Sequence, residues 1–397
     1  MATPSSLYRN AIDLNRFSNS VSRQIIGAYN DIIIDAVNQL RTIDELAAPV
    51  KAARLRAILA QLKASLGTWS NASVQSVAAE LQGLSLLQSD FVTDQLRRAL
   101  PAGARNIVNT VEISPQFAQS VVTTDPTQLN VVTLSDDLFA AVQGAPQTYS
   151  LTAAKGATIT LPNGEVVTKA FNGIVESQAE LFSQVVRNGL LTGEPTPEIA
   201  KRLIGRLQLG QKGSVRQIAE AGGQATKAAN HQVMTLVRTS INQVANAASQ
   251  QVYEANQDIT KRYKYVATLD SRTSPICRAL DGKEFVYGKG PMPPQHFNCR
   301  STTVPVIDYE ELGFTPPPPG RRASMDGQVP ADQTYGQWLA KQPKTVQADV
   351  LGKEKVRYFE LLSEKYGPQN AIVKLVRDDG SELTLQQLQR RYGAANP

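Results

Sequence analysis

Both cysteines of the chain and one of its two histidines lie between residues 277 and 299, so this segment is the first candidate for chemistry. Cys277 is followed by His296 and Cys299, and Asp270 stands shortly before them. Thiolates, imidazoles and carboxylates are the ligands of tetrahedral zinc sites, and a His-x-x-Cys pair has the short spacing typical of such sites. The sequence therefore predicts a structural zinc ion held by Asp270, Cys277, His296 and Cys299.

The stretch between Cys277 and His296 is rich in glycine and proline, which disfavours a helix. A metal ion would order such a loop, because binding and local folding are then one event. Three alternatives stay open: two buried cysteines beside a hydrogen-bonded histidine, a Cys277–Cys299 disulfide, or a Cys277/His296 nucleophile pair oriented by Asp270 or Asp281.

Sequence motifs of common catalytic sites are absent from the chain. It has neither the His-Glu-x-x-His helix of zinc hydrolases nor the deaminase signature, and no P-loop or dinucleotide-binding fingerprint. We therefore expect a protein that is not an enzyme. The alternative is a metal- or thiol-dependent nuclease or peptidase.

The composition is that of a folding chain: 42% of its 397 residues are hydrophobic and 19% are charged. There is no apolar run of about 18 residues and no export signal at the start, so we expect a protein made and kept in the cytoplasm.

Positive charge is concentrated in one part of the chain. The formal net charge is +6, and residues 187–300 contain 16 Lys and Arg against 8 Asp and Glu. Such an excess is typical of contact with a polyanion, although a solvated helical face would look the same. The candidate phosphate contacts are Arg238, Lys261, Arg262, Lys264, Arg272 and Arg300.

The spacing of apolar residues predicts a mainly α-helical fold with small β elements. Near the start, 4-3 spacing from Leu7 to Ile32 indicates a long helix with a narrow apolar stripe that needs a partner. A second helix from Pro49 to Gly67 would complete a hairpin, followed by helices at 72–82 and 85–99.

β-branched clusters follow, and Asn163-Gly164 is the preferred turn of a two-residue hairpin. We divide the chain into an N-terminal helical region (1–104), a β-rich segment (105–178), a helical core with the Cys/His segment (179–314), a stiff Pro-rich linker (315–330) and a small α+β domain (331–397). In that last domain we expect a strand at residues 371–376 and a capping box from Thr384 to Gln387.

Within the core, a long helix at about 215–257 has one apolar face, formed by Val233, Val237, Ile241, Val244, Ala248 and Val252. Arg238 and Asn242 lie four residues apart on another face. We expect them to dock the Asp270 segment, with Arg238 pairing either Asp270 or Asp281.

Several motifs resemble those of phage Mu F-like head morphogenesis proteins, the minor capsid proteins of tailed phages. They stand in the expected order: Arg187-Asn-Gly-Leu with Gly193 and Glu198-Ile-Ala, Arg238-Thr239 with Asn242, Thr268-Leu-Asp270-Ser-Arg272-Thr273 with Cys277 and Leu280-Asp281-Gly282, His296-Phe-Asn298-Cys299-Arg300-Ser301, and Tyr335-Gly-Gln-Trp338-Leu339 with Val350-Leu351-Gly352. Together they cover roughly residues 180 to 395, about half of the chain.

The resemblance implies a virion protein present in few copies that acts in head assembly, with a role in DNA packaging or ejection. Its expected partners are the portal protein, the major capsid protein and packaged double-stranded DNA bound without sequence preference. Self-association through the N-terminal helices is a further expectation, and a portal-docking adaptor without DNA contact is the alternative.

Overall fold

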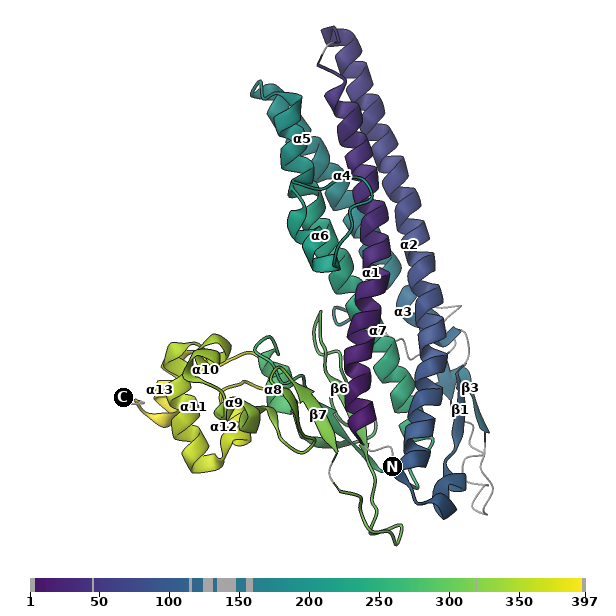
Figure 1. The fold of residues 1–397 in the computed structure, drawn as a ribbon, viewed down its shortest axis with the longest axis vertical. Coiled ribbons are helices and arrows are strands. Elements are labelled where there is room, and N and C mark those ends of the chain that lie inside the picture. The colour runs from purple at the N-terminus through teal and green to yellow at the C-terminus, as the bar shows by residue number, and fades with distance from the viewer. Residues whose placement is uncertain are drawn as a thin grey trace.

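The computed structural model describes residues 4–44, 46–113, 116–123, 131–133, 148–154, 160–318 and 320–394. Over these ranges the chain is mainly α-helical with small sheets, which confirms the predicted fold class. A long helical bundle rises from a small sheet, and a helical unit that holds the C-terminus lies to one side (Figure 1).

Helices α1 (Pro4–Arg41) and α2 (Ala48–Ala99) form the predicted N-terminal hairpin. The apolar stripe of α1 packs against α2 and α7 of the same chain, so it finds its partner within the molecule. Val21 and Ile25 are buried as predicted, but Ala28 faces solvent and Tyr29 takes the buried position. The strict spacing fails there because a straight α-helix drifts relative to a 3.5-residue repeat.

The predicted helix end at Gly67 is wrong, because α2 continues without interruption to Ala99. Tertiary packing offsets the weak helix preference of this glycine. Two residues later, the indole of Trp69 is buried between Tyr29 and Phe171, with ring centroids 5.1 and 5.5 Å away. Its Nε1 donates to the Ile25 carbonyl at 3.0 Å, which ties α2 to α1.

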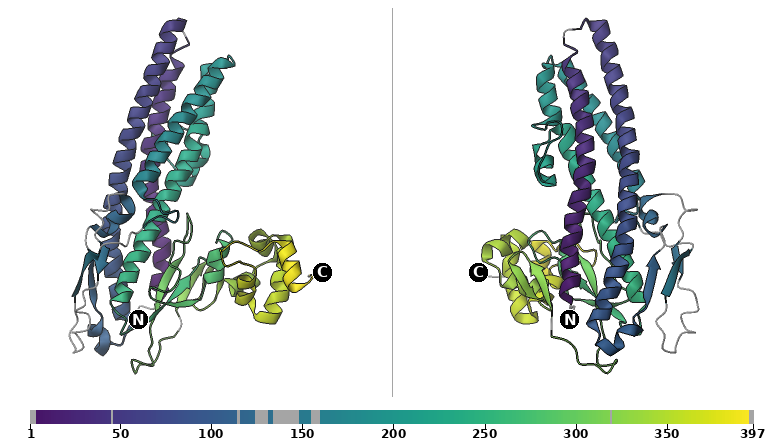
Figure 2. Two further views of the ribbon diagram at one scale, coloured as in Figure 1. Left: turned by 180° about the vertical axis from the view of Figure 1, so that it is seen from behind. Right: turned by 45° about the vertical axis from the view of Figure 1, so that its right-hand side comes forward.

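Two further helices complete the bundle: α4 (Val167–Leu191) and α7 (Gln224–Glu254). Both lie beside the hairpin in the view from behind (Figure 2). All six apolar residues predicted for one face of the long core helix are buried in α7. The short helices α5 (Thr196–Ile204) and α6 (Val215–Ala221) pack against α1 and α7.

Between α2 and α4 lies a small mixed sheet with the order β1-β3-β2. Its strands are β1 (Thr110–Ile113), β2 (Val131–Thr133) and β3 (Thr148–Ala154), accompanied by the 3-10 helix η1 (Ala102–Ile107) and α3 (Gln116–Val122). β2 and β3 pair antiparallel and β1 pairs with β3 in parallel. Parts of the β-branched clusters lie outside the described residues.

The Asn163-Gly164 pair forms a turn, with Gly164 at φ 78°, but the turn does not connect two strands. The chain passes from it directly into α4, so the prediction of a hairpin at this site is wrong. The reason is the burial of Val167 and Phe171, which favours a helix that packs on the bundle.

The core sheet has the order β5-β4-β6, with β4 (Arg262–Val266) antiparallel to both β5 (Glu284–Val286) and β6 (Thr302–Val306). Helix α8 (Pro275–Leu280) lies between β4 and β5 in the chain. A two-stranded sheet of β7 (Arg321–Ser324) and β8 (Gly327–Pro330) follows the prolines.

The C-terminal unit consists of α9 (Tyr335–Ala340), α10 (Lys344–Leu351), α11 (Lys353–Tyr366), α12 (Pro368–Lys374) and α13 (Leu385–Tyr392). The capping box at Thr384 and Gln387 is confirmed. The strand predicted at 371–376 is wrong: most of it is helical in α12, since Pro368 starts a helix whose Ala371 and Ile372 are buried. Within the described residues, no helix is both long enough and apolar enough to cross a membrane.

Candidate metal centre

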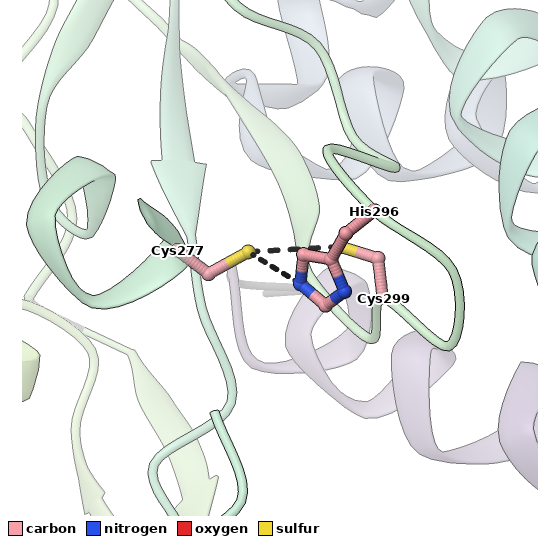
Figure 3. Close-up of side chains that lie close together, drawn as sticks. All are labelled: Cys277, His296 and Cys299. Atoms are coloured by element: carbon pink, nitrogen blue, oxygen red, sulfur yellow. Dashed lines mark hydrogen bonds between the residues drawn. The ribbon is translucent and has the colours of Figure 1, made fainter. Parts of the chain in front are cut away.

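Three potential ligand atoms converge where α8 meets the loop between β5 and β6 (Figure 3). The Cys277 Sγ lies 3.3 Å from the His296 Nε2 and 3.7 Å from the Cys299 Sγ. All three atoms lie within 4.8 Å of one another, and both cysteines are buried. The structure therefore brings together three of the four predicted ligands as a cluster that could hold a metal ion.

The sulfur separation distinguishes a metal site from a disulfide. A disulfide needs about 2.05 Å between the sulfurs, and both thiols are free here at 3.7 Å. Two thiolates on one tetrahedral zinc ion, each bonded at about 2.3 Å, lie about 3.8 Å apart. The two sulfurs are thus already spaced as zinc ligands.

Local structure positions each ligand. Ser274 caps α8, accepting from the Cys277 N–H at 3.5 Å, and Pro275 starts the helix, so Cys277 stands in its first turn. Asn298 sits between the other two ligands at φ 62°, a left-handed conformation that asparagine tolerates better than most residues. Its backbone N–H donates to the Thr239 hydroxyl at 3.0 Å, which anchors the turn on α7.

The two thiols have opposite electrostatic surroundings. A hydrogen bond from Cys277 lowers the pKa of Cys299 to about 6 despite burial, and the backbone N–H groups of Ser301 and Gln295 support the thiolate. The same Cys299 interaction, together with burial, raises the pKa of Cys277 to about 12. The hydrogen bond between His296 and Cys277 raises the pKa of His296. A cation at the centre would take the place of the shared thiol proton.

Asp270, the fourth predicted ligand, is not part of the cluster. Its carboxylate forms a bidentate pair with Arg300, with the Arg300 Nη2 donating to Oδ1 at 2.8 Å. The Thr273 hydroxyl donates to the same oxygen at 3.1 Å. Burial opposes ionisation of Asp270, but the Arg300 interactions outweigh it and lower its pKa. The prediction of Asp270 as a metal ligand is therefore wrong, because the arginine next to Cys299 occupies its carboxylate.

Several hydroxyls that the sequence did not mark as site residues lie at the cluster, among them those of Tyr265, Ser274 and Ser301. The Tyr265 hydroxyl is 3.2 Å from the Cys277 Sγ, and the Ser274 Oγ is 2.7 Å from the His296 Nε2. The alternating burial of β4 points Tyr265 inward, and the Ser-Pro pair that starts α8 places Ser274. Both signals were present in the sequence, but neither residue type is a common zinc ligand.

Arg238 and Asn242 dock the cysteine loop on α7, but not through the predicted pairing. Arg238 donates to the side chains of Asn298 and Asn19 at 3.0 and 3.1 Å, and Asn242 donates to the Ser301 carbonyl at 3.0 Å. Among the described residues, neither Asp270 nor Asp281 pairs with Arg238, because each already has an arginine of its own. Burial lowers the pKa of Arg238, and the charges of two neighbouring arginines add to this effect.

Asp281 is a buried connector rather than a partner of α7. It accepts two hydrogen bonds from Arg322, at 3.2 and 3.0 Å, and one each from the backbone N–H groups of Ala267 and Tyr335, at 2.7 and 2.6 Å. This carboxylate joins the core sheet to β7 and α9.

Most of the cations predicted to contact phosphate are paired with carboxylates. Lys261 pairs with Glu311, Arg262 with Glu284 and Asp308, Lys264 with Glu284, and Arg300 with Asp270. Arg272 is the most exposed of the set, and its Nη2 lies 3.6 Å from Asp270. The structure therefore does not present the six cations as one free basic surface.

The part of the chain that contains this cluster is similar to a known protein family. Residues 180–304 match the model of a family described as phage Mu protein F like protein. The match runs from α4 to the middle of β6 and contains all three residues of the cluster. It confirms the resemblance based on the sequence motifs. No curated protein and no solved structure matches the chain.

Proposed function

Because residues 180–304 form a phage Mu F-like segment, we propose that this protein is a minor capsid protein that acts in head assembly of a tailed bacteriophage. The family match is the observation that carries this proposal. It supports a role in head morphogenesis and association with the virion. We place the protein at or near the portal, in few copies, with contacts to the portal and major capsid proteins.

We further propose that the Cys277, His296 and Cys299 cluster holds a structural Zn²⁺. The spacing of the sulfurs and the thiolate character of Cys299 support this assignment. Either the Tyr265 or the Ser274 hydroxyl, or a water molecule, would complete a tetrahedral site. An ion at this place would join α8 to the loop that α7 anchors, and so fix the core of the family segment.

The same geometry favours a structural role over catalysis. A reactive cysteine is partly exposed and has a depressed pKa, whereas Cys277 is buried and its pKa is raised to about 12. The more acidic thiol, Cys299, is 1% exposed. The His296 Nδ1 lies 2.8 Å from the Phe297 carbonyl, so a backbone group orients the ring where a catalytic pair would use a carboxylate. We therefore propose that the protein is not an enzyme.

We also propose that the protein contacts packaged DNA, through fewer cations than the six that the sequence indicated. Arg238 has no carboxylate partner among the described residues, and Arg272, the most exposed of the predicted cations, only shares the Asp270 carboxylate with Arg300, at 3.6 Å. A contact limited to these residues would be weak and independent of sequence.

Mass spectrometry of purified virions and of DNA-free heads tests the assembly role. We expect a few copies per particle, and co-purification with the portal ring in high salt. Deletion of the gene should leave the coat protein soluble but reduce the yield of infectious heads. Absence of the protein from both virions and assembly intermediates would refute the role.

A further inference from the structure

A cavity of about 130 Å³ lies between the N-terminal part of α1 and the edge of the core sheet. Ile12 and Asn15 of α1 form one wall, and Val266 and Arg300 form another. Ala323 of β7 closes a third side. Figure 1 shows the lower end of α1 beside β6 and β7. Its volume suits one amino-acid side chain and a short piece of backbone, but not the backbone of a DNA duplex.

The surroundings of the cavity carry an excess of positive charge. Arg300 lines it, and Arg272 shares the Asp270 carboxylate with Arg300. Arg238 bonds to Asn19, one helical turn from Asn15, and it senses the charges of both other arginines. Arg300 and Arg272 share one carboxylate, and Arg238, close enough to be affected by both, has no carboxylate partner among the described residues. These four groups carry a net charge of about +2, which an acidic ligand could neutralise.

Two buried polar atoms have no hydrogen-bond partner among the described residues: the Oδ1 of Asn15, which lines the cavity, and the Nε of Arg238, which does not line it but bonds to Asn19 on the same helix as Asn15. The first accepts hydrogen bonds and the second donates them. Buried polar groups are normally paired, so such a couple points to a missing ligand that both donates and accepts. A peptide does both, through its backbone N–H and a carboxylate. A DNA phosphodiester has no donor to offer.

We propose that this cavity, the α1 pocket, binds a short acidic peptide segment of a partner protein. A glutamate or aspartate carboxylate of the partner pairs with the arginines. The partner's backbone N–H donates to the Asn15 Oδ1, and its side-chain methylene groups pack on Ile12, Val266 and Ala323. The proposal goes beyond head assembly as such, because it assigns the chemistry of one contact that the protein makes.

Binding of a synthetic probe tests the α1 pocket. The probe is a fluorescein-labelled Glu-Leu-Glu-Leu-Glu peptide with blocked ends, and its glutamine analogue is the matched control. Fluorescence anisotropy with the full-length protein should show saturable binding of the acidic peptide. The glutamine analogue should bind at least tenfold more weakly, since it loses the charge-assisted hydrogen bonds.

Two variants separate the pocket from general surface charge. Arg272→Gln changes an exposed side chain, and Asn15→Ala removes the unpaired oxygen from a helix that tolerates alanine. Each should weaken peptide binding about fivefold to tenfold. Arg390→Gln, which removes the same charge from an exposed position on α13, should change it less than twofold.

Three results would overturn the proposal. One is a peptide that does not bind, and another is equal weakening by Arg390→Gln and Arg272→Gln. The third is a 20-base-pair DNA duplex that displaces the peptide and loses affinity with Asn15→Ala, which would make the pocket a DNA site. None of these outcomes depends on the metal cluster or on the assembly role, so they are distinguishable from failure of either.

Discussion

Cys277 and Cys299 are neighbours in the fold, and the hydrogen bond that they share shifts their pKa values in opposite directions. Backbone N–H groups and the hydrogen bond with Cys277 lower the pKa of Cys299, whereas the same hydrogen bond and burial raise the pKa of Cys277. Such an arrangement resembles half of a metal site, in which the protein has prepared one thiolate and a cation must displace the proton from the other. The cost of holding a buried thiolate is best explained by a cation that neutralises it.

Replacement of Cys299 by serine tests this interpretation. We expect zinc content, measured by mass spectrometry after dialysis against a weak chelator, to fall from one ion per chain to near zero. Loss of a direct ligand should weaken binding more than about 100-fold, because even an outer hydrogen-bond partner is worth 10–100-fold. Wild-type protein that carries no stoichiometric metal, whatever the growth medium, would contradict the assignment.

Asp270→Asn is the matched control, since its carboxylate pairs with Arg300 and is not a ligand. We expect this variant to keep its zinc but to lose about 3 kcal/mol of unfolding free energy, as happens when one partner of a mostly buried pair is removed. Loss of zinc in this variant would reinstate Asp270 as a ligand.

The effect of Asp270 should depend on pH with a defined sign. Its pKa is lower in the folded protein than the ordinary value of 3.8, so its contribution is complete well above that value and disappears as the pH falls through the folded pKa. Denaturant melts of wild type and Asp270→Asn should therefore differ by a constant amount from pH 7 to about pH 5 and converge below about pH 4. A gap that widens on acidification would rule out the ion pair.

At the scale of elements, α8 faces the cluster of Cys277, His296 and Cys299 on one side and the C-terminal unit on the other. Cys277 belongs to the cluster, whereas Arg278 donates to the Thr273 and Val350 carbonyls at 2.6 and 3.1 Å and lies 3.2 Å from Glu382. Gln369 of α12 donates to the Arg278 carbonyl at 2.9 Å. One short helix thus connects the cluster to the unit beyond the Pro-rich linker.

Arg278→Met should loosen that connection while leaving the cluster intact. Hydrogen exchange in α9 and α10 should increase about tenfold or more, because the buried carbonyl of Val350 and the Glu382 carboxylate lose a donor. Zinc content should not change. Arg357→Met on the exposed side of α11 is the control, and equal exchange in both variants would refute the role of Arg278.

Local sequence signals predicted elements well where packing and propensity agree. The apolar face of α7 and the capping box of α13 were predictable because spacing and cap chemistry are local. The helix end predicted at Gly67 and the hairpin predicted at Asn163-Gly164 were wrong because residues far along the chain decide both structures. Trp69 of α2 packs on α1 and α4, which keeps α2 helical past Gly67. Helix α4 follows the turn because the bundle buries its Phe171. The pairing of Asp270 with Arg300 was missed for the same reason.

At the scale of the whole molecule, net charge overstates the free positive surface. The excess between residues 187 and 300 is real, yet five of the six cations named from it lie in ion pairs with carboxylates. Charge counts along a chain do not show which cations the fold pairs, so the residues of a DNA contact were not predictable from composition.

The salt dependence of DNA binding measures how many cations remain available. For duplex DNA, the logarithm of the association constant should fall with that of salt concentration with a slope of about −2, since two cations contribute roughly −0.9 each. Arg272→Gln should reduce the slope by about one. A slope near −5 would mean that the ion pairs open on binding, and an undetectable complex would remove DNA from the list of partners.

Helix α1 is synthesised first, but some of the residues that pack against it are synthesised much later. Its buried face is covered by α7, which ends at Glu254, and Ser5 accepts a hydrogen bond from the Arg321 N–H at 2.8 Å. During translation at about 5–20 residues per second, that apolar face waits roughly 10–40 s for its cover to leave the ribosome. The nascent protein therefore has a period of exposure to aggregation, and a host chaperone or low expression temperature should raise its yield.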